Sequence, residues 1–430
     1  MLRKILLVAA ASLAGAAAAA APQFKVLHAF CSEQNCTDGN WPYANRLTID
    51  AAGNVYGITG YGGAAGWGSI FELHSNKDRT RYRFETLYSF CTADCSDGRF
   101  PVGKLVIDQA GDLYGTTATG EPVRSGHVFK LEKQKGGGWS LKNLYDFCPS
   151  GADGCADGQT PGEFGLTYAG LEKSLPYDGK SPLYGATKWA GVHNGGTIFR
   201  LLPRKKAPWK LDTIYSFCAQ ENCLDGYVPH AGLTLDSAGN IYGITTYGGP
   251  ANTGLLYELS PAKSGWKQTV LYSFCSQQQC TDGSYPAAPV IIDGGGNLIG
   301  ATAYGGANGD GTLYKLVPKG LHSQHSLIYN FCSADECADG GYPYGGLLRD
   351  TNGDIYGTAQ YGDGEKASGV VYRFSDGALT VLHQFCEEAD CPDGKSPLGG
   401  LARDAEGRLF GMTNEAGSNG NGGTVFAVTP

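Results

Sequence analysis

Residues 214–259 read IYSFCAQENCLDGYVPHAGLTLDSAGNIYGITTYGGPANTGLLYEL, and this stretch decides the fold. It holds three short segments of alternating character, 233–236, 240–245 and 254–259, and a fourth follows at 267–272. Such alternation is typical of β-strands, and the Gly, Asn and Asp residues between the segments favour tight turns. The stretch therefore predicts one antiparallel sheet of four short strands.

The same pattern recurs along the whole chain. Self-comparison gives L-Y-x-F-C, C-x-D-G-x-x-P, L-x-x-D-x-x-G-N-L-Y-G-T and G-T-x-F/Y-x-L in seven copies, whose Asp-Gly pairs begin at Asp38, Asp97, Asp157, Asp225, Asp282, Asp339 and Asp393. The repeats span approximately 24–75, 82–133, 139–203, 209–261, 266–318, 325–376 and 379–430. No length remains for a second domain.

One such sheet cannot cover its own two faces, so neighbouring sheets must stack around an axis. We therefore predict an all-β fold, a seven-bladed β-propeller of four-stranded blades. By analogy with propellers that carry the related L-x-x-D-x-x-G-N-L-Y signal, L-x-x-D is the innermost strand. The chain then begins with an outermost strand at 24–30, which must complete the last blade. About nine extra residues in the third repeat, including 171–180, predict a longer hairpin between its first two strands.

The combination of D-G-x-x-P, G-N-L-Y-G-T and G-T-x-F resembles the GloVer tandem-repeat proteins over essentially all of the mature chain. The resemblance implies an exported bacterial propeller and brings no established activity to transfer. Members often carry C-terminal anchors, and we expect none after Pro430.

The N-terminus indicates export. Residues 1–20 combine a basic start, at Arg3 and Lys4, with an apolar stretch that ends in small residues, which is typical of a secretory signal peptide. No later stretch is apolar for long enough to span a membrane. Cleavage leaves 31 basic and 41 acidic residues, a net charge of −10 that disfavours nucleic acid as a partner. We expect a secreted or periplasmic monomer.

All 14 cysteines fall into seven local pairs: Cys31 with Cys36, Cys91 with Cys95, Cys148 with Cys155, Cys218 with Cys223, Cys275 with Cys280, Cys332 with Cys337 and Cys386 with Cys391. Short, variable separations in an oxidising compartment favour disulfides within each repeat. Zinc would require four ligands, and a redox relay would require a recurring basic neighbour.

One column of residues suggests a ligand site. Four positions after the Gly of L-Y-G-T lie Tyr61, Thr119, Trp189, Tyr247, Tyr304, Tyr361 and Glu415. Aromatic rings beside Gly pairs can expose flat faces on which sugars stack, which motivates a carbohydrate-binding hypothesis. The simpler alternative, which the repetition favours, is that each ring packs over the neighbouring blade.

Asymmetric residues are further leads. Arg46, Lys104, Glu163 and His230 lie near the expected channel where other repeats mostly have Gly. The sequence shows neither a nucleophile beside a base nor convergent metal ligands. The repeated Asp of the Asp-Gly pairs suits turn capping better than calcium binding. We expect no cofactor, no metal and a non-catalytic binding or scaffold role, with a glycan or cell-envelope component as ligand. The alternative is a polysaccharide hydrolase or lyase that uses Arg46, Lys104, His230 and Glu415.

Overall fold

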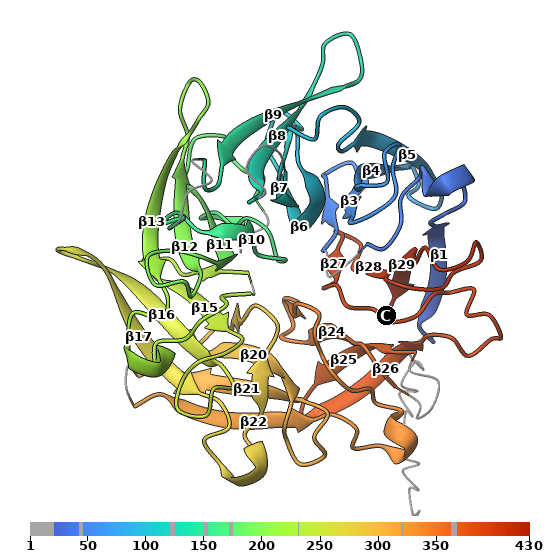
Figure 1. Ribbon diagram of the computed structural model, residues 1–430. Helices are drawn as coiled ribbons and strands as arrows, with labels where there is room; N and C mark the ends of the chain where they lie inside the picture. Colours follow the sequence, from blue (N-terminus) through green and yellow to red (C-terminus); the bar gives the residue numbers. More distant parts are fainter. Residues whose placement is uncertain are drawn as a thin grey trace, which may run out of the picture.

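The computed structural model describes residues 21–42, 46–120, 125–149, 154–171, 175–230, 232–319, 322–362 and 368–430. Within them the strands form seven antiparallel sheets arranged around one axis, which confirms the seven-bladed propeller (Figure 1). These residues contain no α-helix. They include short 3-10 turns at η1 (Gln34–Cys36), η3 (Glu221–Cys223), η4 (Gln278–Cys280) and η5 (Asp335–Cys337).

The first four blades follow one another along the chain, and each runs from an innermost strand A to an outermost strand D. Blade 1 is β2 (Thr48–Ile49), β3 (Val55–Thr59), β4 (Ser69–Ser75) and β5 (Tyr82–Ser89). Blade 2 is β6 (Arg99–Ile107), β7 (Leu113–Thr119), β8 (His127–Lys133) and β9 (Trp139–Asp146). Blade 3 is β10 (Gln159–Pro161), β11 (Leu183–Trp189), β12 (Thr197–Leu202) and β13 (Lys210–Ser216). Blade 4 is β14 (Thr234–Leu235), β15 (Ile241–Thr245), β16 (Leu255–Ala262) and β17 (Gly265–Ser273).

The remaining three blades complete the ring. Blade 5 is β18 (Ser284–Pro286) and β19 (Ile291–Ile292), which both pair with β20 (Leu298–Tyr304), then β21 (Thr312–Val317) and β22 (Gln324–Asn330). Blade 6 is β23 (Leu348–Arg349), β24 (Ile355–Ala359), β25 (Val370–Ser375) and β26 (Ala378–Gln384). Blade 7 is β27 (Ala402–Arg403), β28 (Leu409–Thr413), β29 (Thr424–Thr429) and β1 (Gln23–Ala29).

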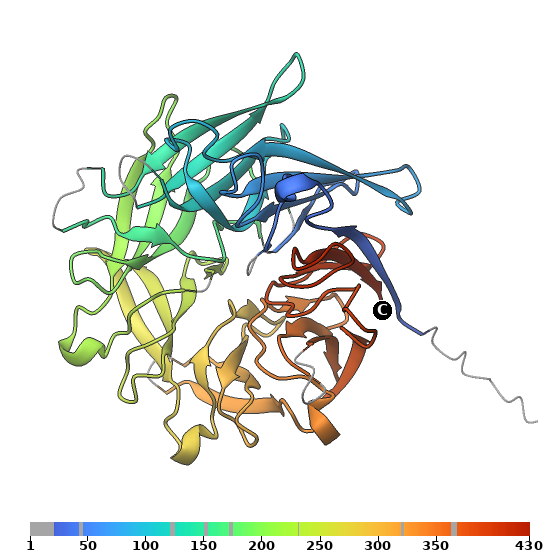
Figure 2. The same ribbon diagram turned by 45° about the vertical axis from the view of Figure 1, so that its right-hand side comes forward.

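The N-terminal strand closes the ring, as the repeat register predicts. β1 pairs antiparallel with β29, from Gln23 opposite Thr429 to Ala29 opposite Thr424. The dark blue strand lies beside the red final blade in both views (Figures 1 and 2). A sequence repeat is therefore offset by one strand from a blade, so each repeat begins on the outer edge of the preceding blade. The expected signal peptide, residues 1–20, lies outside the described residues.

The core lies between blades. Tyr56, Ile58 and Ile70 of blade 1 pack against Leu113 and Phe129 of blade 2, and equivalent clusters separate the other blades. This face-to-face packing is the burial that a lone four-stranded sheet lacks.

The Gly of L-Y-G-T and the aromatic residue of G-T-x-F/Y form one packing unit. A Cβ added to Gly57 would lie 2.4 Å from Cζ of Phe71, and one added to Gly243 would lie 2.3 Å from the hydroxyl oxygen of Tyr257. These distances leave no room for a side chain, so the ring of strand C lies directly on the glycine of strand B.

The A–B turns confirm the structural role of D-x-x-G-N. Asp236 accepts hydrogen bonds from the backbone N–H groups of Ala238 and Asn240, each at 2.9 Å, and from the hydroxyl of Tyr242 at 3.2 Å. In blade 3 the insertion does more than extend a hairpin. Tyr177 is fully buried, and its backbone N–H donates to the carbonyl of Ile107 in blade 2 at 2.9 Å. The insertion thus joins two blades on this face, which we call the turn face; residues 172–174 of the expected hairpin lie outside the described part.

Candidate functional site

Each loop that leads from a strand D to the next strand A contains one disulfide, and the face on which these loops and the B–C loops lie is called the Cys-loop face. All seven expected pairs are bonded: Cys31–Cys36, Cys91–Cys95, Cys148–Cys155, Cys218–Cys223, Cys275–Cys280, Cys332–Cys337 and Cys386–Cys391. The carbonyl of the second Cys accepts a hydrogen bond from the neighbouring B–C loop, as from Gly63 N–H to Cys36 at 3.0 Å and from Gly249 N–H to Cys223 at 3.2 Å. The disulfide loop therefore anchors the loop that carries the aromatic column.

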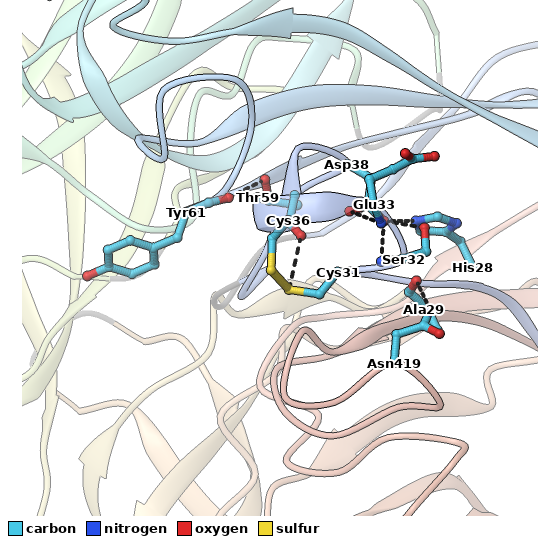
Figure 3. The surroundings of a disulfide bond; sticks show 11 residues. His28, Ala29, Cys31, Ser32, Glu33, Cys36, Asp38, Thr59, Tyr61 and Asn419 are labelled. Carbon is cyan, nitrogen blue, oxygen red and sulfur yellow. Dashed lines mark hydrogen bonds and ion pairs between the residues drawn. A yellow bond between two sulfur atoms is a disulfide. The ribbon is translucent and has the colours of Figure 1, made fainter.

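The Asp of each Asp-Gly pair caps the same loop. Its carboxylate contacts the Tyr or His of L-Y-x-F at 2.6 to 3.0 Å in every repeat, in the pairs His28–Asp38, Tyr88–Asp97, Tyr145–Asp157, Tyr215–Asp225, Tyr272–Asp282, Tyr329–Asp339 and His383–Asp393. It also accepts backbone N–H groups of the loop, as Asp38 does from Ser32 at 3.0 Å (Figure 3). This confirms the capping role.

The aromatic column is positioned by a pairing that the sequence pattern did not reveal. Each column residue lies opposite the residue two positions after the Asp of Asp-Gly: Tyr61 opposite Asn40, Thr119 opposite Arg99, Trp189 opposite Gln159, Tyr247 opposite Tyr227, Tyr304 opposite Ser284, Tyr361 opposite Gly341 and Glu415 opposite Lys395. In blade 1 the hydroxyl of Thr59 also donates to the carbonyl of Tyr61 at 2.9 Å (Figure 3). The backbone of the column is thus fixed on both sides.

Three column tyrosines join a continuous row of rings, which we call the tyrosine arc. It runs Tyr227, Tyr247, Tyr285, Tyr304, Tyr342 and Tyr361 through blades 4 to 6, with successive ring centroids 5.0 to 5.7 Å apart. The residues between column members, such as Tyr285 and Tyr342, come from the x-x of D-G-x-x-P. These intervening rings could have been found in the sequence, because the D-G-x-x-P motif holds an aromatic residue in most repeats.

A second row, the tryptophan arc, belongs to blades 1 and 2. Trp41 stacks on Tyr61 with centroids 5.4 Å apart, Tyr61 contacts Phe100 at 5.0 Å, and Phe100 contacts Trp67 at 5.1 Å. Trp189 is 49% exposed, and none of the ring contacts among the described residues involves it.

The two alternatives for the column are therefore not exclusive. Tyr304 packs against Tyr342 of the next repeat, as the packing hypothesis states, yet it stays 39% exposed, close to the values for Tyr61 and Tyr361. The rings of Tyr61, Tyr304 and Tyr361 are thus each held by a neighbour and still present part of their surface to solvent. This is the arrangement that a stacking surface requires.

The other column positions lack rings. Glu415 pairs with Lys395 at 3.3 Å, so an ion pair replaces the aromatic contact in blade 7. Thr119 lies opposite Arg99, whose guanidinium lies 5.1 Å from the centre of the Trp67 ring.

The four asymmetric residues near the channel form two groups rather than one. Glu163 pairs with Lys188 and with His230, whose Nε2 lies 2.7 Å from Oε2 of the carboxylate. Burial raises the pKa of Glu163, but the hydrogen bond and charge of His230 and the charge of Lys188 outweigh burial and lower that pKa to about 2. A carboxyl group that stays ionised near neutral pH is poorly suited to general acid catalysis.

Arg46, just before strand A of blade 1, and Lys104, within strand A of blade 2, form the second group. They line a cavity of about 1610 Å³ that neither His230 nor Glu415 lines. The four residues named for a hydrolase or lyase therefore do not converge in one pocket.

Metal-ligating groups are sparse in the described part of the chain. Asp310, Cys332 and Cys337 have ligand atoms close together, but the two sulfur atoms are bonded to each other and offer no thiolate. Asp339 and Asp393, from the acidic loops of repeats six and seven, are engaged in loop capping.

The repeat that forms these loops also characterises a known protein family. The sequence matches the Gloeobacter/Verrucomicrobia repeat family over residues 15–174 and 276–430. The chain belongs to this family. The unmatched segment between those ranges carries the same Gloeobacter/Verrucomicrobia features, including the Cys218–Cys223 disulfide and the contact between Tyr215 and Asp225.

Other comparisons add little about ligands. No curated protein matches the sequence. Among solved structures, a Bacteroides uniformis protein whose proposed activity is that of a 6-phosphogluconolactonase is 13% identical with a TM-score of 0.46, and the match covers 79% of this chain and 83% of that one. A similarity at this level does not bear on what a Gloeobacter/Verrucomicrobia repeat protein binds.

The seven disulfides fit an oxidising, extracytoplasmic compartment. None of the helices in the described residues has the length and apolar character needed to cross a bilayer.

Proposed function

We propose that this chain is an exported binding or scaffold propeller that recognises a glycan or another cell-envelope component without transforming it. The tyrosine arc carries the proposal, because it places six contacting rings along one face of three adjacent blades. Tyrosine offers an apolar ring face to sugar C–H groups and a hydroxyl to sugar oxygens.

The rigidity of the arc supports the same proposal. Tyr247 is paired with Tyr227 through backbone hydrogen bonds, and the loop that follows it is tied to Cys223. Side chains ordered before binding lose less conformational entropy when a ligand arrives. An arc spread over several blades also suits an extended, repeating ligand better than a small metabolite.

Glycan-array binding tests the proposal. The double variant Tyr247→Ala, Tyr304→Ala should lose array binding, whereas Val192→Ala removes an exposed apolar side chain from the B–C loop of blade 3, outside the tyrosine arc, and should not. Tyr361→Ala is a second test with less structural cost, since among the ring contacts of the described residues Tyr361 has only the one with Tyr342. Absent binding, or binding unchanged in these variants, would exclude the arc as the site.

Turnover measurements on the same glycans separate the binder from the alternative hydrolase or lyase. We expect intact glycan after prolonged incubation. Released reducing ends or unsaturated products would instead support the enzymatic alternative.

A further inference from the structure

The cavity around the propeller axis suggests a second site that does not depend on the tyrosine arc. It opens on the turn face, since its lining includes A–B turn residues such as Ala51, Ala110, Ser237 and Ala405 and no residue of a Cys loop. At about 1610 Å³ it exceeds the roughly 300–1,000 Å³ of ordinary small-molecule pockets.

At one depth along the propeller axis, which we call the cation level, the residues that line this cavity differ strongly between blades. The strand registers place the same inner-strand position of the seven blades at Arg46, Lys104, Gly165, Gly232, Pro289, Gly346 and Gly400. Five of the seven therefore have no side chain or only a proline ring, and the two cations come from adjacent blades. Glu163 of blade 3 and His230 of blade 4 lie two positions before this level, so they do not share a column with the two cations.

The far side of this level is closed by an apolar side chain. Phe164 follows Glu163 in the inner segment of blade 3, and a Cβ added to Gly232 of blade 4 or Gly346 of blade 6 would come within 3.0 or 4.0 Å of it. At this level the cations face an aromatic ring and glycine backbone. The acidic residues of the cavity lining lie elsewhere: Asp50, Asp108, Asp236 and Asp404 cap the A–B turns, and Glu72 lies on β4.

Neither cation has a carboxylate partner. Among the residues that the structure describes, no acidic oxygen lies within 4.0 Å of Arg46 or Lys104, and Arg46 is oriented by one hydrogen bond, from its Nε to the carbonyl of Leu401 at 2.7 Å. Two other cavity arginines are paired, Arg79 with Glu406 at 2.5 Å and Arg403 with Asp350 at 3.8 Å. Both terminal amino groups of Arg46 and the ammonium of Lys104 remain available to a ligand.

The electrostatics of this pair favour an anion. Burial, and then the charge of Arg46, lower the pKa of Lys104 to about 7, and burial lowers the pKa of Arg46 to about 10. Two buried cations close to each other destabilise each other, and an oxyanion between them removes that repulsion.

We infer that Arg46 and Lys104 form a binding site for a ligand that carries an oxyanion, either a carboxylate or a phosphate group. The guanidinium binds the two oxygens side by side, and the ammonium contacts the same group from the next blade. The remaining cavity, lined by Phe164 and the glycine positions, accommodates the body of the ligand.

Calorimetric titration of the mature chain with inorganic phosphate, galacturonate and galactose tests the site. We expect one of the two anions to bind and neutral galactose not to bind, and the preferred anion identifies the source of the oxyanion. The variants Arg46→Met and Lys104→Met should each weaken binding at least about tenfold. Lys135→Met, which removes a lysine from an exposed turn-face hairpin, should leave binding unchanged.

Three results would overturn the inference: neither anion binds at about 10 mM, both cation variants bind as the unaltered chain does, or Lys135→Met weakens binding equally, which would indicate general charge attraction. Thermal unfolding of each variant shows whether the fold is kept. Because the tyrosine arc is untouched, a negative result at the cavity leaves the glycan proposal standing, and the reverse also holds.

Discussion

Replacing Asp282 by Ala tests the claim that a carboxylate, as well as a disulfide, holds each Cys loop. Asp282 is almost fully buried and accepts hydrogen bonds from the hydroxyl of Tyr272 at 2.6 Å, from the N–H and hydroxyl of Ser276 at 2.9 and 2.7 Å, and from the N–H of Gln277 at 3.2 Å. Hydrogen bonds to a charged acceptor contribute about 1.5–3 kcal/mol each. Ser276 and Gln277 are exposed, so water replaces part of what they lose.

These contacts predict a loss of about 3 kcal/mol in the free energy of unfolding. For a chain of this length that loss corresponds to a fall of about 3 °C in Tm, if unfolding is cooperative. Removing the neighbouring Cys275–Cys280 disulfide, with its sequence separation of 5, should cost only about 2 kcal/mol on the chain-entropy model. Calorimetry of Asp282→Ala and of Cys275→Ala, Cys280→Ala at pH 7 compares the two directly.

Tyr272→Phe is the matched control. It removes one donor to Asp282 and retains the ring that stacks on His325, with centroids 4.1 Å apart, so we expect a loss of about 1.5 kcal/mol, roughly half of that for Asp282→Ala. If Asp282→Ala unfolds at the same temperature as the unaltered chain, the carboxylate does not hold the loop and the capping argument is wrong.

The pH dependence gives an independent check. Burial raises the pKa of Asp282, but its hydrogen bonds, chiefly from Tyr272 and Ser276, outweigh burial and leave that pKa below the ordinary value of 3.8. The stabilisation is therefore complete above about pH 4 and disappears as the pH falls through the folded-state pKa. The difference in Tm between the unaltered chain and Asp282→Ala should shrink in that window, and a constant difference would contradict the assignment.

Three further changes test the packing. Tyr257→Phe removes a fully buried hydroxyl that has no hydrogen-bond partner among the described residues, so the free energy of unfolding should stay the same or rise by up to about 1 kcal/mol. A clear loss in denaturant titration would reveal a missed contact. Gly243→Ala should cost about 2 kcal/mol because its Cβ meets Tyr257 at 2.3 Å. Gly136→Ala, whose added Cβ meets no atom of the described part of the chain within 4 Å, should stay within about 0.5 kcal/mol. Deleting residues 21–30 exposes the edge of β29, and we expect lower stability and self-association by light scattering; a monomer of unchanged Tm would argue against ring closure by β1.

The fold could be predicted because its determinants are local and repeated. The alternation around 240–245 and the turn at Asp236 act within one blade. Because the same signal occurs seven times, a closed ring is the arrangement in which every sheet is covered by its neighbours. The disulfides followed from even local pairing at short separations in a chain whose N-terminus predicts export. The pairing of Tyr247 with Tyr227 could not be predicted in this way, because it depends on how the D-G-x-x-P segment folds back along strand B after the Cys loop.

The contacts near the axis were harder still to predict, since they join residues from different blades. The strand pairing places Glu163 and His230 two residues before the position held by Arg46 and Lys104, so the four side chains do not form one column. Once the strand pairing corrects the register, Glu163 binds His230 and the two remaining cations are left facing the cavity.

The distribution of symmetry over the ring explains why two sites are proposed rather than one. Some contacts, such as the Tyr272–Asp282 pair, recur in every blade. They cap the Cys loops, so every blade needs them whatever the protein binds. The residues that differ between blades fall into two groups, one on each face of the ring. On the turn face, blades 1 to 3 supply Arg46, Lys104 and the insertion around Tyr177, whereas on the Cys-loop face blades 4 to 6 keep an unbroken row of tyrosines. Substitutions on one face leave the contacts of the other intact, so the two proposals can be tested in the same molecule without one result deciding the other.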